Sequence, residues 1–85
     1  MTISLDLLLR SYRDGDEHGW ETEFAWLEEH HPQKIAELMD DIHAVGIQEP
    51  ILLGSDGRIW DGHHRIYAAH RLGLKRVPVV RSDDA

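Results

Sequence analysis

The chain contains no cysteine among its 85 residues, and this absence excludes several kinds of chemistry. Disulfide bonds, thiol nucleophiles and thiolate metal ligands all require that side chain. Aromatic residues are also few, at 7% of the chain, and there are only three prolines. A chain of this length is expected to form one small domain of modest stability, because it buries only about 60–65% of its unfolded surface.

Long apolar runs are absent as well. No stretch approaches the roughly 20 residues that a membrane-spanning helix requires. The first residues lack the basic region and clean apolar stretch that mark a secretion signal. We therefore expect a cytoplasmic protein without a membrane partner.

Basic residues are scarce in the first half of the chain. Residues 1–45 hold 11 acidic and 3 basic side chains, a net charge of −8, whereas residues 46–85 hold 5 and 6, a net charge of +1. Non-specific DNA binding depends on many Lys and Arg side chains against phosphates, and the acidic half argues against it. The acidic half suits a basic protein partner, and the second half suits a compact anion.

Hydrophobic spacing predicts an α/β (α+β) domain in which helices flank a small mixed β-sheet. Apolar residues alternate over residues 3–9 and predict a strand, although Leu8 breaks the alternation and leaves a short helix from Ser4 as the alternative. The spacing further predicts helices at about 20–29, 32–45 and 63–72, strands at 50–53, 58–60 and 77–80, and a frayed tail at 82–85. The strand at 77–80 is either buried or at an edge.

The segment Asp61-Gly62-His63-His64-Arg65 lies between a predicted strand and a predicted helix. A strand that turns through glycine into a helix leaves unpaired N–H groups at the helix start, where the helix dipole is positive. Such a start binds phosphate, and the imidazoles and the guanidinium fork add further donors. The residues alone fit equally well an ordinary helix start with solvated polar side chains.

Residues 35–81 resemble the N-terminal domain of the ParB/sulfiredoxin superfamily. The resemblance covers more than half of the chain and consists of five features in order. These are a long helix with Gly46-Ile47-Gln48-Glu49-Pro50-Ile51, a Gly-containing hairpin, the segment 61–65, a helix ending in Leu72-Gly73-Leu74, and the strand Val77-Pro78-Val79-Val80.

In this superfamily a glycine–x–x–arginine turn holds nucleotide phosphates: CTP in partition proteins, ATP in sulfiredoxin and ADP in a free serine kinase. The resemblance therefore implies that this chain binds ATP, ADP or CTP together with Mg²⁺. The phosphate-binding residues that it implies are Gly62, His63, His64 and Arg65. The residues that it places beside the nucleotide are Gly46, Gln48 and Pro50.

Several positions depart from individual branches of the superfamily. His63 stands in place of the reactive cysteine of sulfiredoxin, which excludes sulfiredoxin chemistry. Tyr67 replaces a phosphate-contacting arginine of partition proteins, and Glu49 replaces a glutamine. The segment 61–65 is most similar to the serine kinase and to small ParB-like proteins of bacteria and phages.

Asp61 is the candidate catalytic residue, as a general base or a contact to Mg²⁺. Its alternative role is to cap the following helix. A zinc site of Asp61 with His63, His64 and His70 is a weaker alternative, because adjacent histidines rarely converge on one metal. We assign no metal ligands.

The aromatic residues are expected to serve mainly in the core. Trp20 and Phe24 share a helix face with Leu27, and Trp60 is expected to pack in the core. Trp26 falls outside this stripe and covers a nucleotide base or meets a partner. The pair at 30–31 is expected on the surface.

We expect a single domain over residues 1–85, without the helix-turn-helix and dimerisation domains of complete partition proteins. The favoured function is a small accessory or phage protein that binds a nucleotide, a protein partner, or both. The alternative is a phosphotransferase or nucleotide hydrolase, in which Asp61 assists and Arg65 stabilises the transferred charge. A DNA-associated ParB-like protein is a weaker alternative, and no carboxylate pair is clearly placed for two-metal cleavage.

Overall fold

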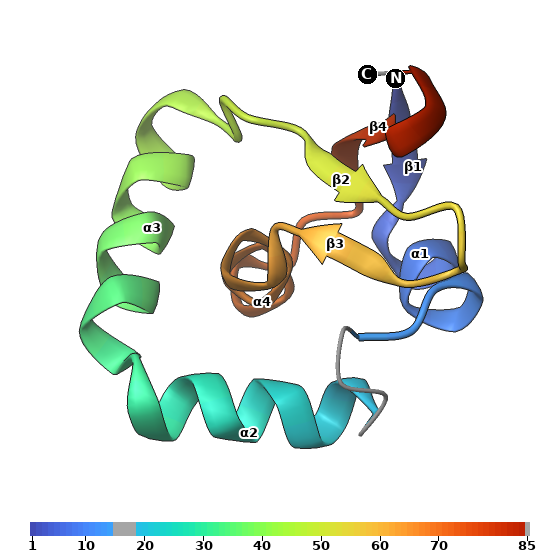
Figure 1. Cartoon of the computed structure of the whole chain (residues 1–85). Coiled ribbons are helices and arrows are strands. Elements are labelled where there is room, and N and C mark those ends of the chain that lie inside the picture. The colour runs from blue at the N-terminus through green and yellow to red at the C-terminus, as the bar shows by residue number, and fades with distance from the viewer. Residues whose placement is uncertain (15–18, 85) are drawn as a thin grey trace.

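The computed structural model describes residues 1–14 and 19–84. The described elements, in order, are β1 (Thr2–Ser4), α1 (Leu5–Ser11), α2 (Trp20–His30), α3 (Pro32–Val45), β2 (Ile51–Leu53), β3 (Ile59–Asp61), α4 (His63–Leu72), β4 (Arg76–Arg81) and the 3₁₀ turn η1 (Ser82–Asp84) (Figure 1). None of the described helices is both long and apolar enough to cross a membrane.

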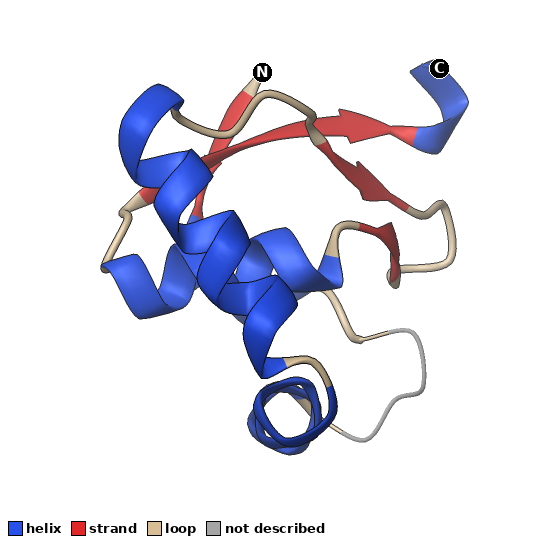
Figure 2. Cartoon of the chain, turned by 90° about the vertical axis from the view of Figure 1, so that its left-hand side faces the viewer, coloured by secondary structure: helices blue, strands red, loops and turns tan. Residues whose placement is uncertain are grey.

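The strands form one mixed sheet in the order β1-β4-β2-β3. β4 pairs antiparallel with β1 and parallel with β2, while β2 and β3 form an antiparallel hairpin. The helices α1 to α4 gather on one side of this sheet (Figure 2). The predicted α+β class is therefore confirmed, and the strand predicted at 77–80 occupies an interior position.

The predicted strand over residues 3–9 is wrong beyond Ser4, and the alternative helix is confirmed. β1 ends at Ser4, whose Oγ accepts a hydrogen bond from the backbone N–H of Leu7 at 3.2 Å. This N-cap satisfies one of the open donors of α1. Leu5 and Leu8 are then both buried, as the helical i, i+3 spacing requires.

α4 is the central helix of the domain. In Figure 1 it is seen end-on, with the sheet above it, α3 beside it and α2 below it. Its residues Ile66 and Ala69 pack into the main core with the inward side chains of β2 and β4. Tyr67 faces the other way and packs with Leu27 of α2 and Ile35 of α3. Every layer of the fold therefore contacts α4.

A polar contact joins α2 to α4 at the edge of the second core. The hydroxyl of Tyr67 donates to the Glu28 carboxylate at 3.0 Å, and Arg71 donates to the same oxygen at 3.0 Å. The ring of Phe24 stacks on that of Tyr67 at 4.9 Å. Trp20 and Phe24 are partly buried against the main core, in agreement with the sequence prediction.

The predicted core position of Trp60 is wrong, because 51% of this residue is exposed. The pairing of β2 with β3 shifts register at Leu52/Leu53, and Trp60 lies between the two paired positions of β3. Ile59 before it is buried, so the alternation of side chains along the strand already turns Trp60 to the exposed face. The indole instead covers Gly54 and donates to Asp56 Oδ1 at 3.0 Å.

The predicted frayed tail is also wrong over its first part. Residues Ser82–Asp84 form the 3₁₀ turn η1 directly after β4, and Ala85 lies outside the described residues.

The close approach between α4 and β2 generates a stability prediction. Gly62 has a φ of +115°, and a Cβ there would lie 3.0 Å from Ile51 Cγ1 and 3.3 Å from Ile51 Cα. Gly62→Ala is expected to lower the free energy of unfolding by about 1–3 kcal/mol, since it adds a steric conflict to backbone strain. Urea unfolding measures this loss.

Gly73→Ala is the matched control. Gly73 also has a positive φ, of +72°, but a Cβ there meets nothing within 4 Å. We expect a smaller loss of about 1 kcal/mol from strain alone. Equal losses in the two variants would contradict the role of the Gly62–Ile51 contact.

Candidate functional site

The start of α4 has no side-chain cap. Gly62 is the N-cap residue, and its carbonyl accepts the first helical hydrogen bond from Ile66 at 2.9 Å. Glycine has no side chain that can accept bonds from the first-turn amides, and no acidic residue lies in that turn. The positive potential of the helix start is therefore available to a negatively charged ligand.

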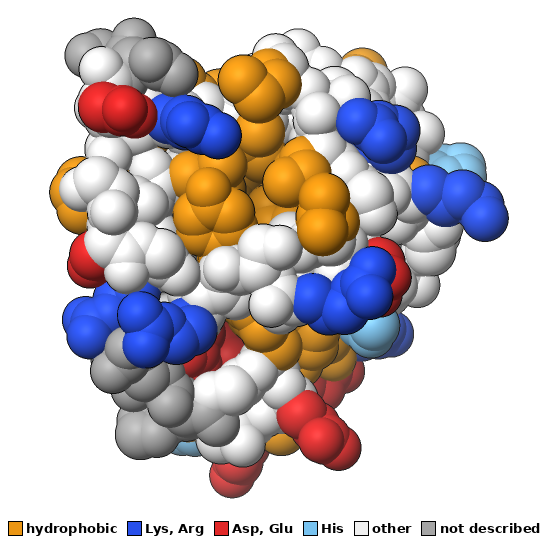
Figure 3. All heavy atoms as spheres, turned by 90° about the vertical axis from the view of Figure 1, so that its right-hand side faces the viewer, with side chains coloured by type: hydrophobic (Ala, Val, Ile, Leu, Met, Phe, Trp, Pro, Cys, Tyr) orange, Lys and Arg blue, Asp and Glu red, His pale blue; other side chains and the backbone are white. Residues whose placement is uncertain are grey.

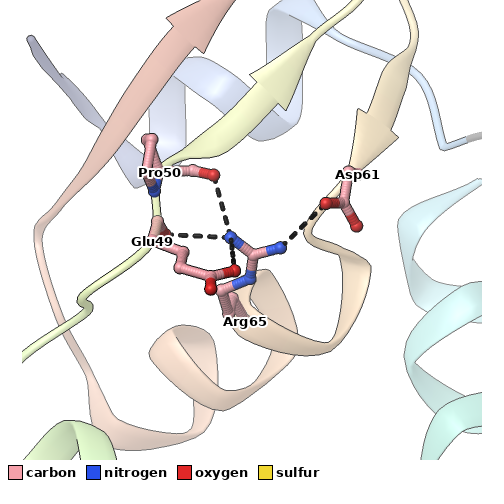
Figure 4. A network of polar contacts seen from close by, with 4 residues as sticks. All are labelled: Glu49, Pro50, Asp61 and Arg65. Atoms are coloured by element: carbon pink, nitrogen blue, oxygen red, sulfur yellow. Dashed lines mark hydrogen bonds and ion pairs between the residues drawn. The ribbon is translucent and has the colours of Figure 1, made fainter.

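Arg65 links this helix start to the segment before β2. Its Nη1 donates to the carbonyl oxygens of Glu49 at 2.9 Å and Pro50 at 2.8 Å, and its Nη2 donates to Asp61 Oδ2 at 3.2 Å (Figure 4). The side chain is only 15% exposed. These contacts use three of the five guanidinium N–H donors.

Asp61 lies at the rim of the site rather than at a cap position. Its side chain is 70% exposed and forms an ion pair with Arg65, one helical turn away. α4 has no side-chain cap, so the predicted alternative role of Asp61 as a cap is wrong. The Glu49 carboxylate approaches Arg65 from the other side, at 3.9 Å. Two carboxylates therefore flank the guanidinium.

The two histidines of the segment point to different neighbours. The His63 ring lies 5.8 Å from the Trp20 ring, and the His64 ring lies 5.3 Å from that of His31. Burial lowers the pKa of His64 below its ordinary value of 6.5, and the nearby positive charge of Lys34 adds to this effect. His64 is therefore neutral at pH 7. Its Nε2 is buried and has no partner among the described residues.

Sequence reasoning missed two contributors to this site. His31 is exposed as predicted, but it also contacts His64, because Pro32 starts α3 beside the start of α4. The carbonyls of Glu49 and Pro50 anchor Arg65, and no side-chain pattern signals a backbone acceptor. Only the approach of distant segments reveals either contact.

The three residues predicted beside the nucleotide lie next to Arg65. Gly46 ends α3, the Gln48 amide donates to the Val45 carbonyl, and Pro50 accepts from Arg65. Gly46 and Gln48 line a pocket of about 290 Å³ that Arg65 also lines. The pocket also contains the acidic residues Asp41 and Glu49. The structure thus brings the predicted residues together, and their contact with a nucleotide stays a prediction.

The zinc alternative is not supported by the arrangement of its side chains. Within residues 1–14 and 19–84, no three His, Cys, Asp or Glu side chains lie close enough to hold a metal ion. His70 lies at the far end of α4 and stacks on Phe24 at 5.0 Å.

The acidic half of the chain forms much of the surface of α2 and α3. Exposed acidic residues on these helices are Glu21, Glu28, Glu29, Glu37, Asp40 and Asp41. Figure 3 shows acidic side chains at the lower edge of one face, where α2 lies in Figure 1, below an apolar area bordered by Lys and Arg. A protein partner on the acidic surface stays a prediction.

The burial of Arg65 generates a second stability prediction. Arg65→Ala removes three hydrogen bonds and is expected to lower the free energy of unfolding by about 2 kcal/mol, because two carbonyls lose their donor. Arg10→Ala is the matched control, since Arg10 forms the same i, i+4 ion pair with Asp6 but is 72% exposed. We expect it to cost under about 0.5 kcal/mol. Similar losses in urea unfolding would contradict the structural role of Arg65.

The lowered pKa of His64 generates a pH prediction. The unfolded chain binds a proton at His64 more readily than the folded chain does. Protonation therefore favours the unfolded chain, and the stability that neutral His64 provides is full above about pH 6.5 and is lost as the pH falls. We expect His64→Gln to lose less stability than the unaltered protein between about pH 7.5 and pH 5.5. Urea unfolding at both pH values measures the difference, and His43→Gln, an exposed change on α3, is the control. An unchanged pH dependence in His64→Gln would refute the assignment.

Comparison with known proteins agrees with this architecture. Sulfiredoxin from Arabidopsis thaliana superimposes with a TM-score of 0.65 and 27% identity, over 95% of this chain and 83% of that one. A Pnob8-like ParB-N domain superimposes with a TM-score of 0.62 and 15% identity, over 95% of this chain and 28% of that one.

Two curated proteins are similar in sequence. The ParB-like nuclease domain-containing protein YnaK of Escherichia coli is 35% identical over 51 residues, which span 60% of this chain and 59% of that protein. The chromosome-partitioning protein ParB of Myxococcus xanthus is 41% identical over 54 residues, 60% of this chain but 18% of that protein. The chain thus matches less than two thirds of either relative.

The ParB N-terminal domain family matches residues 21–84, which include all of α2 but its first residue, and α3, the hairpin, α4 and β4. The predicted resemblance is therefore confirmed at the level of the superfamily. The chain belongs to the ParB N-terminal domain family.

Proposed function

We propose that this domain binds a nucleotide through its phosphates at the start of α4. The observation that carries the proposal is the guanidinium of Arg65, fixed by two carbonyls beside the uncapped helix start at Gly62. A fixed guanidinium loses little further freedom when it binds an anion. The first-turn amides of α4 and the imidazoles of His63 and His64 supply additional donors.

The charges around the site favour a ligand that arrives with a cation. Arg65 and the helix start supply positive potential, but the carboxylates of Asp61 and Glu49 oppose it. Mg²⁺ fits this arrangement, because it prefers oxygen ligands and binds through one or two carboxylates together with substrate phosphates. Asp61 and Glu49, both highly exposed, would hold the ion, which would neutralise phosphate charge.

Binding is the function that this geometry supports better than turnover. Asp61, the candidate catalytic residue, is exposed and paired with Arg65. An exposed carboxylate of this kind does not form part of a closed, water-excluding site of the sort that phosphoryl transfer uses. Because both carboxylates beside the helix start are paired with Arg65, they do not form the pair that two-metal phosphodiester cleavage uses. Phosphotransfer or nucleotide hydrolysis is the alternative, and turnover lost in Asp61→Asn with binding retained would support it.

Isothermal titration with ATP, ADP and CTP in the presence of Mg²⁺, and with adenosine and cytidine, tests the proposal. At least one nucleotide is expected to bind much more tightly than its nucleoside, because the phosphates make the main contacts. Arg65→Lys is expected to weaken binding by about tenfold or more, since lysine keeps the charge but lacks the fork.

Arg71→Lys is the control for this experiment. Arg71 lies on the last turn of α4, where it pairs with Glu28, away from the helix start. Each variant is titrated at a temperature at which circular dichroism shows it to be folded. Equal affinity for a nucleotide and its nucleoside, or no binding at millimolar concentrations, would refute the proposed function.

A further inference from the structure

Trp26 is a large apolar side chain that the core does not use. It lies on α2 directly before Leu27, which is buried, while 47% of Trp26 is exposed. An exposed indole offers a large, rigid apolar face with a polar N–H, which suits it to contact a ligand.

Two histidines hold the indole in place. The ring of His30 stacks on it at 4.5 Å with an interplanar angle of 19°, and Nδ1 of His30 lies 2.9 Å from the Trp26 carbonyl oxygen. The ring of His31 lies 5.3 Å from the indole at 59°. We refer to Trp26, His30 and His31 as the stacking surface. Because His30 covers one side of the indole, the exposed part is already ordered before a ligand arrives.

The stacking surface is continuous with the start of α4. His31 contacts the indole of Trp26 on one side and His64, in the first turn of α4, on the other, at 5.3 Å in each case. A phosphate bound at the helix start would therefore lie within the span of one nucleotide from Trp26.

The opposite side of the helix start has a different chemistry. There Arg65 borders the pocket at the end of α3, which contains the carboxylates of Asp41 and Glu49. The stacking surface lies at the beginning of α3 and has Lys34 nearby. A planar aromatic group attached to phosphates is favoured on the side of Trp26, because the rings that gather there can stack on it.

We propose that the stacking surface binds the base of the nucleotide, stacked on the exposed side of Trp26, while the phosphates bind at Gly62 and Arg65. The inference rests on the proposed function and assigns a second subsite to it. Stacking uses the face of a base and not its hydrogen-bonding edge, so the subsite accepts purines and pyrimidines.

The test compares ATP with inorganic tripolyphosphate, both with Mg²⁺, by isothermal titration. The unaltered protein is expected to bind ATP about tenfold or more tightly than tripolyphosphate, because only ATP has a base to stack. In Trp26→Ala the affinity for ATP is expected to fall to that for tripolyphosphate, which itself stays unchanged. Trp26→Phe is expected to keep part of the difference.

Trp60→Ala is the matched control. Trp60 is exposed to a similar degree, 51%, but it lies on the hairpin and is held by Asp56. We expect this variant to bind both ligands as the unaltered protein does. CTP in place of ATP is expected to give the same pattern.

Three results would overturn the inference, and they are distinguishable. If ATP and tripolyphosphate bind equally well, the domain holds phosphates and has no base subsite. If ATP binds more tightly but Trp26→Ala does not change this, the base lies elsewhere, for example in the pocket beside Gly46. If neither ligand binds, the proposed function itself fails, and the inference fails with it.

Discussion

The contacts of one guanidinium connect the parts of this domain that matter for binding. Arg65 joins α4 to the segment before β2 through two carbonyls and to the end of β3 through Asp61. They act where the backbone at Gly62 comes close to Ile51 at the start of β2. A site built this way has little freedom to rearrange, so its binding properties depend on the integrity of the surrounding fold.

The same arrangement explains why acidic and basic groups alternate around the start of α4. An isolated, mostly buried guanidinium would be costly, and the flanking carbonyls and carboxylates offset that cost. They also weaken the attraction for a bare phosphate. The acidic surfaces of α2 and α3 add to this long-range repulsion, which makes the accompanying cation and the short-range donors decisive.

Much of the fold could be predicted from residue spacing, whereas the details of the site could not. α3 and α4 have clear apolar stripes ended by Gly46 and Gly73, and both were predicted with nearly the observed bounds. α1 was predicted only as the alternative to a strand, because its leucines fit both, and the cap at Ser4 decides between them. The register shift beside Trp60 and the contact between His31 and His64 depend on how distant segments meet, and local spacing carries no such information.

The position of β1 has a consequence for how the chain folds. β1 pairs with β4, and Arg76 donates to Thr2 across 74 positions of sequence. Closing so long a loop has a high entropic cost, and contacts of high sequence separation slow folding. The hairpin of β2 and β3 and the turn into α4 require only local contacts, so we expect them to form first. Addition of β1 to the sheet would then be the late step that limits the folding rate.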